Sequence, residues 1–246
     1  AAWRRVGNHC MLPAMNLACS GLAPNAKQDD WLKLAGDDEK LQKGMERLYR
    51  LFKDAPVLGS LINPRASGGD MLEADFNELQ PLLEKALKSE ANDDTAQEMA
   101  VTARGVAKAA EILAGQFTLI ATNVPYLGAR KQGAVLRSFC EDGYPEAKAD
   151  LATCFVERSL CFANVGGSTC LVTPQNWLFL SSYTKFRKNL LATSTWDLLA
   201  RLGPKGFQTP MWDFNIALLL ITRKSPAARN EFAGVDVSDE DAPILK

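Results

Sequence analysis

Residues 123–126, Asn-Val-Pro-Tyr, place an amide, a proline and an aromatic ring directly after an apolar run. An aromatic amine such as the N6 group of adenine is a poor nucleophile, because its lone pair is delocalised into the ring. Two acceptors that bind both N–H groups favour a pyramidal nitrogen and direct its lone pair toward an electrophile. Asn123 offers a side-chain carbonyl, and the backbone carbonyl of Val124 or Pro125 offers the second acceptor. Pro125 fixes φ and keeps this geometry rigid, while Tyr126 can stack on the face of the base.

The same tetrapeptide is also compatible with an ordinary turn, because Asn and Pro are both common turn residues. Its position favours a site, since it lies between the end of an apolar segment and a loop that contains Arg130 and Lys131. A second polar and aromatic cluster, Thr-Pro-Gln-Asn-Trp at 173–177, follows the next apolar segment. Ligand sites of open α/β sheets lie at the carboxyl ends of the strands, so the two clusters are expected at one edge of a sheet.

The elements that must position these residues alternate between strand and helix from residue 117 onward. Strands are predicted over 117–122, 168–173, 196–203 and 215–224, and helices over 134–141, 147–163 and 181–191. This alternation favours a parallel, doubly wound sheet. The last two strands are joined by a segment too short for a crossover helix, so they should pair antiparallel. The expected fold class is α/β, a partial Rossmann-like sheet with an antiparallel C-terminal edge strand.

The chain before residue 117 is predicted to be loops and helices. Residues 37–56 carry an amphipathic helical pattern, and the apolar segment 57–62 is predicted as a short strand. Two further helical patterns cover 76–89 and 92–115; the second begins at Asn and Asp capping residues and ends at Gly115. Together they form an inserted helical region. The expected division is therefore 1–116 as a loop and helical part, 117–224 as the core, and 225–246 as an acidic tail or the start of a linker.

Composition narrows the function classes. The 246 residues carry a net charge of −1, but residues 117–224 hold 12 Lys and Arg against 7 Asp and Glu; this excess fits a polyanion-facing half, although one this small is usually just a solvated face. His9 is the only histidine, so a zinc site and Ser-His or Cys-His catalysis are not expected. The six cysteines form no Cys-x-x-Cys pair and are typical of reduced thiols. Neither a membrane-spanning run nor a signal-peptide pattern is found, so a cytoplasmic protein without membrane partner or metal is expected.

The segment FTLIATNVPYLG at 117–128 resembles the catalytic motif of S-adenosylmethionine-dependent N6-adenine DNA methyltransferases, usually written Asn-Pro-Pro-Tyr. The resemblance continues in family order through DLATCFVERSL, GGSTCLVTPQNWLFLSSYTKFRKNLL, LLARLGPKGFQTP and NIALLLITRK. Within the family, these segments are most similar in sequence to the large adenine methyltransferases of BREX phage-exclusion systems. The resemblance implies a class I methyltransferase sheet, S-adenosylmethionine as the donor, double-stranded DNA as the substrate and other subunits of a defence system as partners.

The resemblance also implies a role for each residue of the motif. Asn123 and the carbonyl at the Val124–Pro125 step would bind the target amino group, and Tyr126 would stack on the extruded adenine. Phe207 matches an aromatic residue that stacks on the other face of the base. Extrusion is required because the N6 atom cannot meet a methyl donor inside the duplex.

Further roles are implied outside the motif, each beside a plainer alternative. Phe155 matches a position that packs on the adenine ring of the donor, although its helical spacing also fits a core residue. Arg130 and Lys131 would contact phosphate, or would be solvated loop charges. Asp70 is the candidate for the acid that contacts the donor, with Asp75 as its competitor.

Two departures from the family pattern bear on these expectations. Val124 replaces the usual first proline, at a position that contributes only its backbone. The chain contains no Gly-x-Gly, whereas the family has a Gly-rich turn at the donor site; that turn is expected before Ala1, and the chain is expected to be a fragment with an incomplete donor pocket. The expected function is adenine-specific DNA methylation in a phage-defence or restriction-modification system. The alternatives are an inactive methyltransferase-like subunit that binds DNA or a partner, and a glutamine or RNA methyltransferase that uses the same motif.

Overall fold

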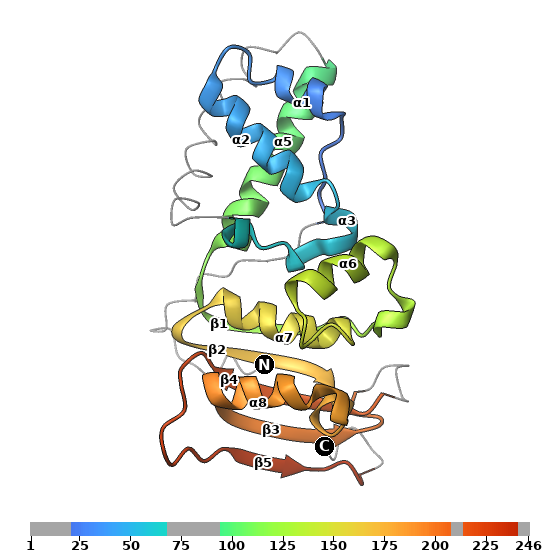
Figure 1. Ribbon diagram of the computed structural model, residues 1–246, viewed down its shortest axis with the longest axis vertical. Helices are drawn as coiled ribbons and strands as arrows, with labels where there is room; N and C mark the ends of the chain where they lie inside the picture. Colours follow the sequence, from blue (N-terminus) through green and yellow to red (C-terminus); the bar gives the residue numbers. More distant parts are fainter. Residues whose placement is uncertain (1–20, 68–93, 208–213, 241–246) are drawn as a thin grey trace, which may run out of the picture.

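The computed structural model describes residues 21–67, 94–207 and 214–240. A helical part and a sheet part follow one another along the long axis of the molecule (Figure 1). The helical part consists of α1 (Gln28–Lys33), α2 (Glu39–Phe52), α3 (Ala55–Leu58), η2 (Gly59–Leu61), η3 (Pro64–Ser67) and α5 (Asp94–Ala114). The sheet part consists of β1 (Phe117–Asn123), η4 (Ala129–Lys131), α6 (Ala134–Gly143), α7 (Leu151–Phe162), β2 (Ala163–Pro174), η5 (Asn176–Leu178), η6 (Ser181–Tyr183), α8 (Thr184–Thr193), β3 (Thr195–Gly203), β4 (Ile216–Thr222) and β5 (Ala233–Asp236).

The helical part is held by the apolar face of α2 and the small-residue face of α5. α2 begins at Asp38, whose carboxylate accepts a hydrogen bond from the Leu41 amide at 3.0 Å. Its spacing buries one face of the helix: Leu41, Met45, Leu48 and Phe52. The buried residues of α5 are mostly alanines: Ala96, Ala100, Ala103, Ala107, Ala110 and Ala114, with Val106 and Leu113. These small side chains let α5 lie close against α2, because the distance between two packed helices depends on the side chains at the contact.

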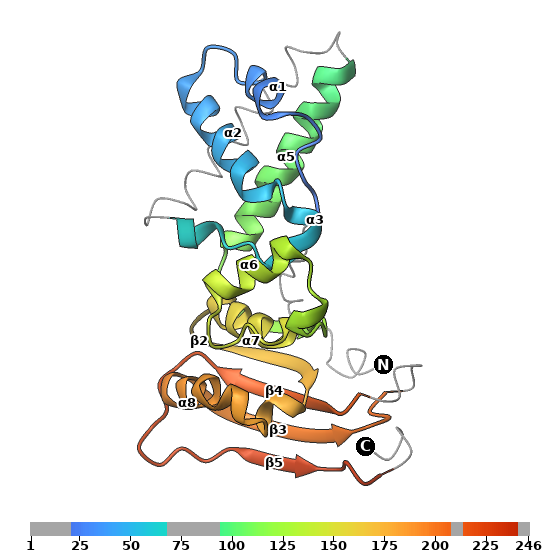
Figure 2. The ribbon, with the colours of Figure 1, turned by 45° about the vertical axis from the view of Figure 1, so that its right-hand side comes forward.

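The sheet has five strands in the order β1-β2-β4-β3-β5. β1 and β2 are parallel, with Asn123 opposite Val172 near their carboxyl ends. β4 is antiparallel to both of its neighbours, β2 and β3. α7 packs against β1 and β2, on the side of the sheet part that faces the helical part (Figure 2). α8 packs toward β3, where the ring of Trp177 lies between those of Phe186 and Trp196.

The α/β class and the antiparallel direction of the last long strand are confirmed, but that strand does not lie at the edge of the sheet. β4 is inserted between β2 and β3. Its composition suits this inner position, because the strand is apolar on both faces up to Thr222, and four of its seven residues are buried. The edge is formed instead by β5, which pairs parallel to β3. β5 lies inside the segment that its acidic composition predicts to be a tail, 225–246.

The structure also bears on the strand and the helices expected in the first half of the chain. The apolar segment 57–62, expected as a strand, is helical instead, in α3 and η2. Pro56 lies in the first turn of α3, where its fixed φ suits a helix, and Gly59 ends that helix with a φ of 52°. The helix expected over 92–115 is confirmed as α5, whereas the one expected over 76–89 lies outside the described residues. Within the described ranges, no helix combines the length and the apolar content that a bilayer crossing requires.

Candidate active site

The tetrapeptide 123–126 leaves the sheet at the carboxyl end of β1. Asn123 is exposed there and is the last residue of the strand. Val124 is buried, and its amide donates to the carbonyl oxygen of Val172 at 3.3 Å, so the parallel pairing with β2 extends one residue past the strand. In the described part of the chain, the carbonyl oxygens of Val124 and Pro125 accept no hydrogen bond, and Pro125 is exposed whereas Val124 is buried.

Tyr126 turns back toward the end of the strand. Its hydroxyl donates to Oδ1 of Asn123 at 3.1 Å. Its ring lies 5.6 Å from the ring of Phe214, at an interplanar angle of 54°. Burial raises the pKa of Tyr126 above its ordinary value, so the hydroxyl remains a donor at neutral pH. The tyrosine hydroxyl shows that Oδ1 of Asn123 is placed to accept a hydrogen bond. A donor group that reaches this edge of the sheet can bind the same oxygen.

The loop after the tetrapeptide is fastened at its start and along its length. Gly128 pairs with Asp150 in an isolated antiparallel bridge, directly before α7. Asp150 also begins α7, because its carboxylate accepts from the Ala152 amide at 2.9 Å. Arg137 on α6 donates to three carbonyl oxygens of the loop, those of Ala129, Arg130 and Gln132, at 3.1, 3.4 and 3.1 Å. The backbone of η4 is thus fixed while the side chains of Arg130 and Lys131 are exposed.

The remaining residues expected at the site lie in three other places. Phe155 lies on α7, half-buried and packed against the core. Phe207 lies in the segment after β3 with 39% of its side chain exposed, and residues 208–213 that follow it are outside the described part. Asp70 and Asp75 are also outside it. The structure therefore brings Asn123 and Tyr126 together with the neighbouring backbone carbonyls, and it gives no contact between Phe155 and this group.

Phe214 is a residue of the site that the sequence reasoning missed. It lies two residues before β4, with 44% of its side chain exposed. Because β4 is antiparallel to β2, it begins at the edge of the sheet where β1 and β2 end. The signal was present in the sequence, since an aromatic residue directly before an antiparallel strand must lie at the carboxyl edge of its parallel neighbours.

The cluster at 173–177 forms the adjoining wall. Gln175 donates its backbone amide to the carbonyl oxygen of Asn215 at 2.8 Å, which ties the end of β2 to the beginning of β4. Trp177 is buried, and its Nε1 donates to Oγ1 of Thr173 at 3.1 Å. Both contacts are structural and hold the edge on which the acceptors lie.

The residues of this edge fit an amine better than they fit a complete methyl donor. They offer the amide oxygen of Asn123, two backbone carbonyls to which no described residue donates, and an aromatic ring. For the donor, the described residues offer one candidate, Phe155, whose exposed part is small because it packs on the core. Among the described residues no cluster of three or more His, Cys, Asp or Glu side chains is placed to hold a metal ion.

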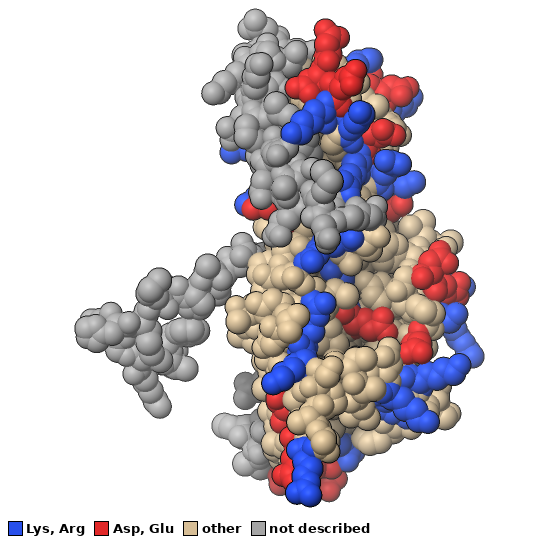
Figure 3. Space-filling model, turned by 60° about the vertical axis from the view of Figure 1, so that its left-hand side comes forward, with Lys and Arg blue, Asp and Glu red and all other residues tan. Residues whose placement is uncertain are grey.

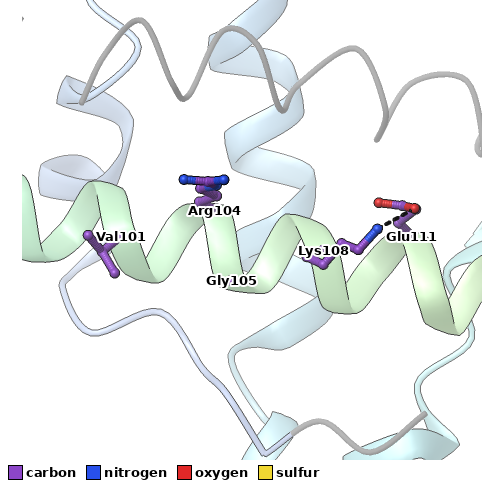
Figure 4. A pocket seen from close by; sticks show the side chains of 5 residues that line it. All are labelled: Val101, Arg104, Gly105, Lys108 and Glu111. Atoms are coloured by element: carbon purple, nitrogen blue, oxygen red, sulfur yellow. Dashed lines mark hydrogen bonds and ion pairs between the residues drawn. The ribbon is translucent and has the colours of Figure 1, made fainter. Parts of the chain in front are cut away.

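Two hollows elsewhere in the chain do not compete with this site. One lies along α5, where Lys108 is paired with Glu111 at 2.6 Å (Figure 4). The other, of about 550 Å³, lies between the α2–α3 region and the helices α6 and α7. Its wall includes Glu157, whose pKa is raised to about 7 by burial and by the nearby Glu146.

The surface in Figure 3 carries both signs of charge over the helical part, so that face presents no field of a single sign.

Comparisons with known proteins match most of the chain. The model of the family described as Eco57I restriction-modification methylase matches residues 26–207. The adenine-specific methyltransferase BrxX of Escherichia coli O9:H4 (strain HS) is 30% identical over 175 residues, which are 71% of this chain and 14% of that protein. The adenine-specific methyltransferase PglX of Lacticaseibacillus casei (strain Zhang) is 32% identical over 107 residues, 43% of this chain and 9% of that protein. The chain thus spans less than a sixth of the length of either curated relative.

Among solved structures, a nuclease-deletion mutant of the Type ISP restriction-modification enzyme LlaGI, in complex with a DNA substrate mimic, matches 66% of this chain and 19% of its own. The sequence identity is 14% and the TM-score 0.40. A likeness of this size carries no functional argument.

Proposed function

The chain belongs to the Eco57I restriction-modification methylase family, and on that premise we propose that its site holds the N6 amine of an extruded adenine for methylation by S-adenosylmethionine. The observation that carries the proposal is Oδ1 of the exposed Asn123, which accepts a hydrogen bond at 3.1 Å beside the carbonyls of Val124 and Pro125, to which no described residue donates. The names of the two relatives, both adenine-specific methyltransferases, support adenine as the base.

The residues of the chain would act on the amine in a defined way. Asn123 would accept one N–H of the amine and a carbonyl at Val124 or Pro125 the other, which withdraws the nitrogen lone pair from the ring. The donor, when bound, supplies an electrophilic methyl group. Asn123 is an amide and takes up no proton, so the proton released from the nitrogen would pass to solvent, which reaches Asn123 at this exposed edge.

The remaining parts of the proposal concern DNA and donor contacts. Tyr126 would stack on the base, with Phe207 as the candidate for its other face. The exposed side chains of Arg130 and Lys131 would contact phosphate, which positions DNA without reading its sequence. Phe155 is the proposed contact for the donor, with Asp70 as the candidate acid. The proposed setting is a phage-defence or restriction-modification system in the cytoplasm, where the cysteines, free in the described part, stay reduced.

The test is transfer of a labelled methyl group to three substrates: unmodified DNA, ribosomal RNA and release-factor protein. We expect label at N6 of adenine in DNA with a wild-type protein that has a complete donor pocket, and its loss when Asn123→Ala is introduced into the same protein. Label in RNA or protein instead would overturn the choice of substrate. DNA binding without transfer, equal in the wild type and Asn123→Ala, would overturn the enzymatic role and favour a binding subunit.

A further inference from the structure

The ring pair of Tyr126 and Phe214 constrains how a base can reach Asn123. Tyr126 makes two contacts at once: its hydroxyl donates to Oδ1 of Asn123 at 3.1 Å, and its ring lies 5.6 Å from that of Phe214. A tilted aromatic pair at this separation is attractive, because the positive edge of one ring approaches the negative face of the other. The phenylalanine therefore favours the one ring position in which the hydroxyl reaches the amide.

The backbone under Phe214 is fixed, so its ring is a defined surface. Asn215, the next residue, accepts a hydrogen bond from the Gln175 amide at 2.8 Å through its carbonyl oxygen. Ile216 then pairs with Pro174 on β2 and with Gly203 on β3. Phe214 is thereby held at the edge of the sheet by two strands, although 91 positions of the sequence separate it from Asn123.

The oxygen that Tyr126 occupies is the one that the proposed substrate needs. An amine that donates to Oδ1 of Asn123 must share this acceptor with the tyrosine hydroxyl or displace it. If the amine and the hydroxyl share Oδ1, the base stacks poorly on Tyr126. A tyrosine whose hydroxyl is directed at the amide presents the hydroxyl end of its ring, rather than its ring face, to the incoming amine. The base can stack on Tyr126 only after the ring has moved.

We infer that Phe214 is a positioning residue that holds Tyr126 in a resting position, in which the tyrosine hydroxyl stands in for the substrate amine on Asn123. The inference rests on the proposed function for its substrate, but the resting contact is a property of the chain alone. Base entry exchanges one donor for another on the same oxygen, so the acceptor is never left unpaired.

The resting contact can be tested without substrate. The chain has four tyrosines, so selective labelling of tyrosine ring carbons gives few NMR signals, and Tyr126→Phe identifies the one of interest. We expect Phe214→Ala to shift the Tyr126 signal and Phe214→Tyr to restore its position. Phe179→Ala is the matched control, because Phe179 is also an exposed phenylalanine after β2 but lies 5.1 Å from Arg201 instead. An unchanged Tyr126 signal in Phe214→Ala would overturn the inference.

A kinetic measurement tests the stand-in role. Tyr126→Phe keeps the ring and removes the competing hydroxyl, so we expect the KM for DNA to fall on the order of threefold to tenfold, as for loss of one hydrogen bond, with a smaller change in kcat. An unchanged or raised KM would overturn the stand-in role. If no variant transfers methyl groups in a protein that has a complete donor pocket, the proposed function fails, and the NMR comparison still decides whether Phe214 holds Tyr126.

Discussion

At the scale of single residues, the proposed role of Asn123 requires a hydrogen-bond acceptor, and the charge of its side chain is secondary. A carboxylate accepts two hydrogen bonds, so Asn123→Asp retains the geometry that Asn123→Ala removes. Loss of one preorganised hydrogen-bonding group at a reacting centre costs on the order of 100-fold in rate. We therefore expect methyl transfer to fall about 100-fold in Asn123→Ala and about tenfold or less in Asn123→Asp, measured as label incorporated into DNA. Equal loss in both variants would contradict a role as acceptor.

Glu157 gives a second prediction at this scale, on stability. Its pKa is raised to about 7 in the folded chain, first by burial and then by Glu146. Because the folded-state pKa lies above that of the unfolded chain, the contribution of Glu157 to stability is fully present below about pH 4.5 and is lost as pH rises through 7. Glu157→Gln should therefore unfold at a higher urea concentration than the wild type at pH 8, and at a similar one near pH 4.5. A difference that is constant with pH would contradict the raised pKa.

At the residue scale, the sequence predicted that Asn123 and Tyr126 lie together and that the cluster at 173–177 lies at the same edge of the sheet. Asn123 and Tyr126 are three positions apart, and turn chemistry was sufficient to expect both at the end of a strand. Phe214 was missed, because the antiparallel direction of β4 indicates only the edge at which it lies, and its contact with Tyr126 depends on where β4 enters the sheet. The half-burial of Phe155 likewise depends on which face of α7 meets β1 and β2, which helical spacing alone left open.

At the scale of elements, one buried arginine joins the sheet part to the helical part. Arg158 on α7 donates to the carbonyl oxygens of Ser60, Ile62 and Leu113 at 3.0, 2.8 and 2.8 Å. Its guanidinium also lies 3.8 Å from the centre of the Phe162 ring. Burial lowers the pKa of Arg158 to about 10, which leaves it charged at neutral pH.

Replacement of this arginine should be costly. Arg158→Met leaves three carbonyl oxygens without their donor, so we expect a loss on the order of 3 kcal/mol in the free energy of unfolding. Arg50→Met, at an exposed position on α2, should change it by about 0.5 kcal/mol or less. Urea unfolding curves of the two variants provide the measurement. Similar midpoints for both would show that α7 and the helical part are joined by other contacts.

The order of the strands was the element-scale property that the sequence did not determine. The short connection between β3 and β4 made their antiparallel pairing predictable. The same connection would allow β4 to pair on either side of β3. The side on which it pairs depends on burial across the whole sheet. β5 was missed because four exposed residues carry no apolar pattern.

At the scale of the whole molecule, β1 is an edge strand with apolar side chains in solvent. It pairs with β2 alone among the described strands, and 61% of the Leu119 side chain is exposed. An exposed apolar edge strand is a template for pairing with another chain. We expect Leu119→Lys to reduce association of the chain, measured by light scattering over a concentration series. Val57→Lys, at an exposed position on α3, is the control and should change nothing. A wild-type chain that stays monomeric throughout the series would contradict the expectation.

The place of β4 between β2 and β3 also sets an order of events during synthesis. β2 and β3 have no hydrogen bonds to each other, so neither can complete its ladder until residues 216–222 have left the ribosome. A nascent chain halted before that point would hold Asn123 and Tyr126 without their aromatic neighbour. The contact between Tyr126 and Phe214 would then form only when β4 enters the sheet between β2 and β3.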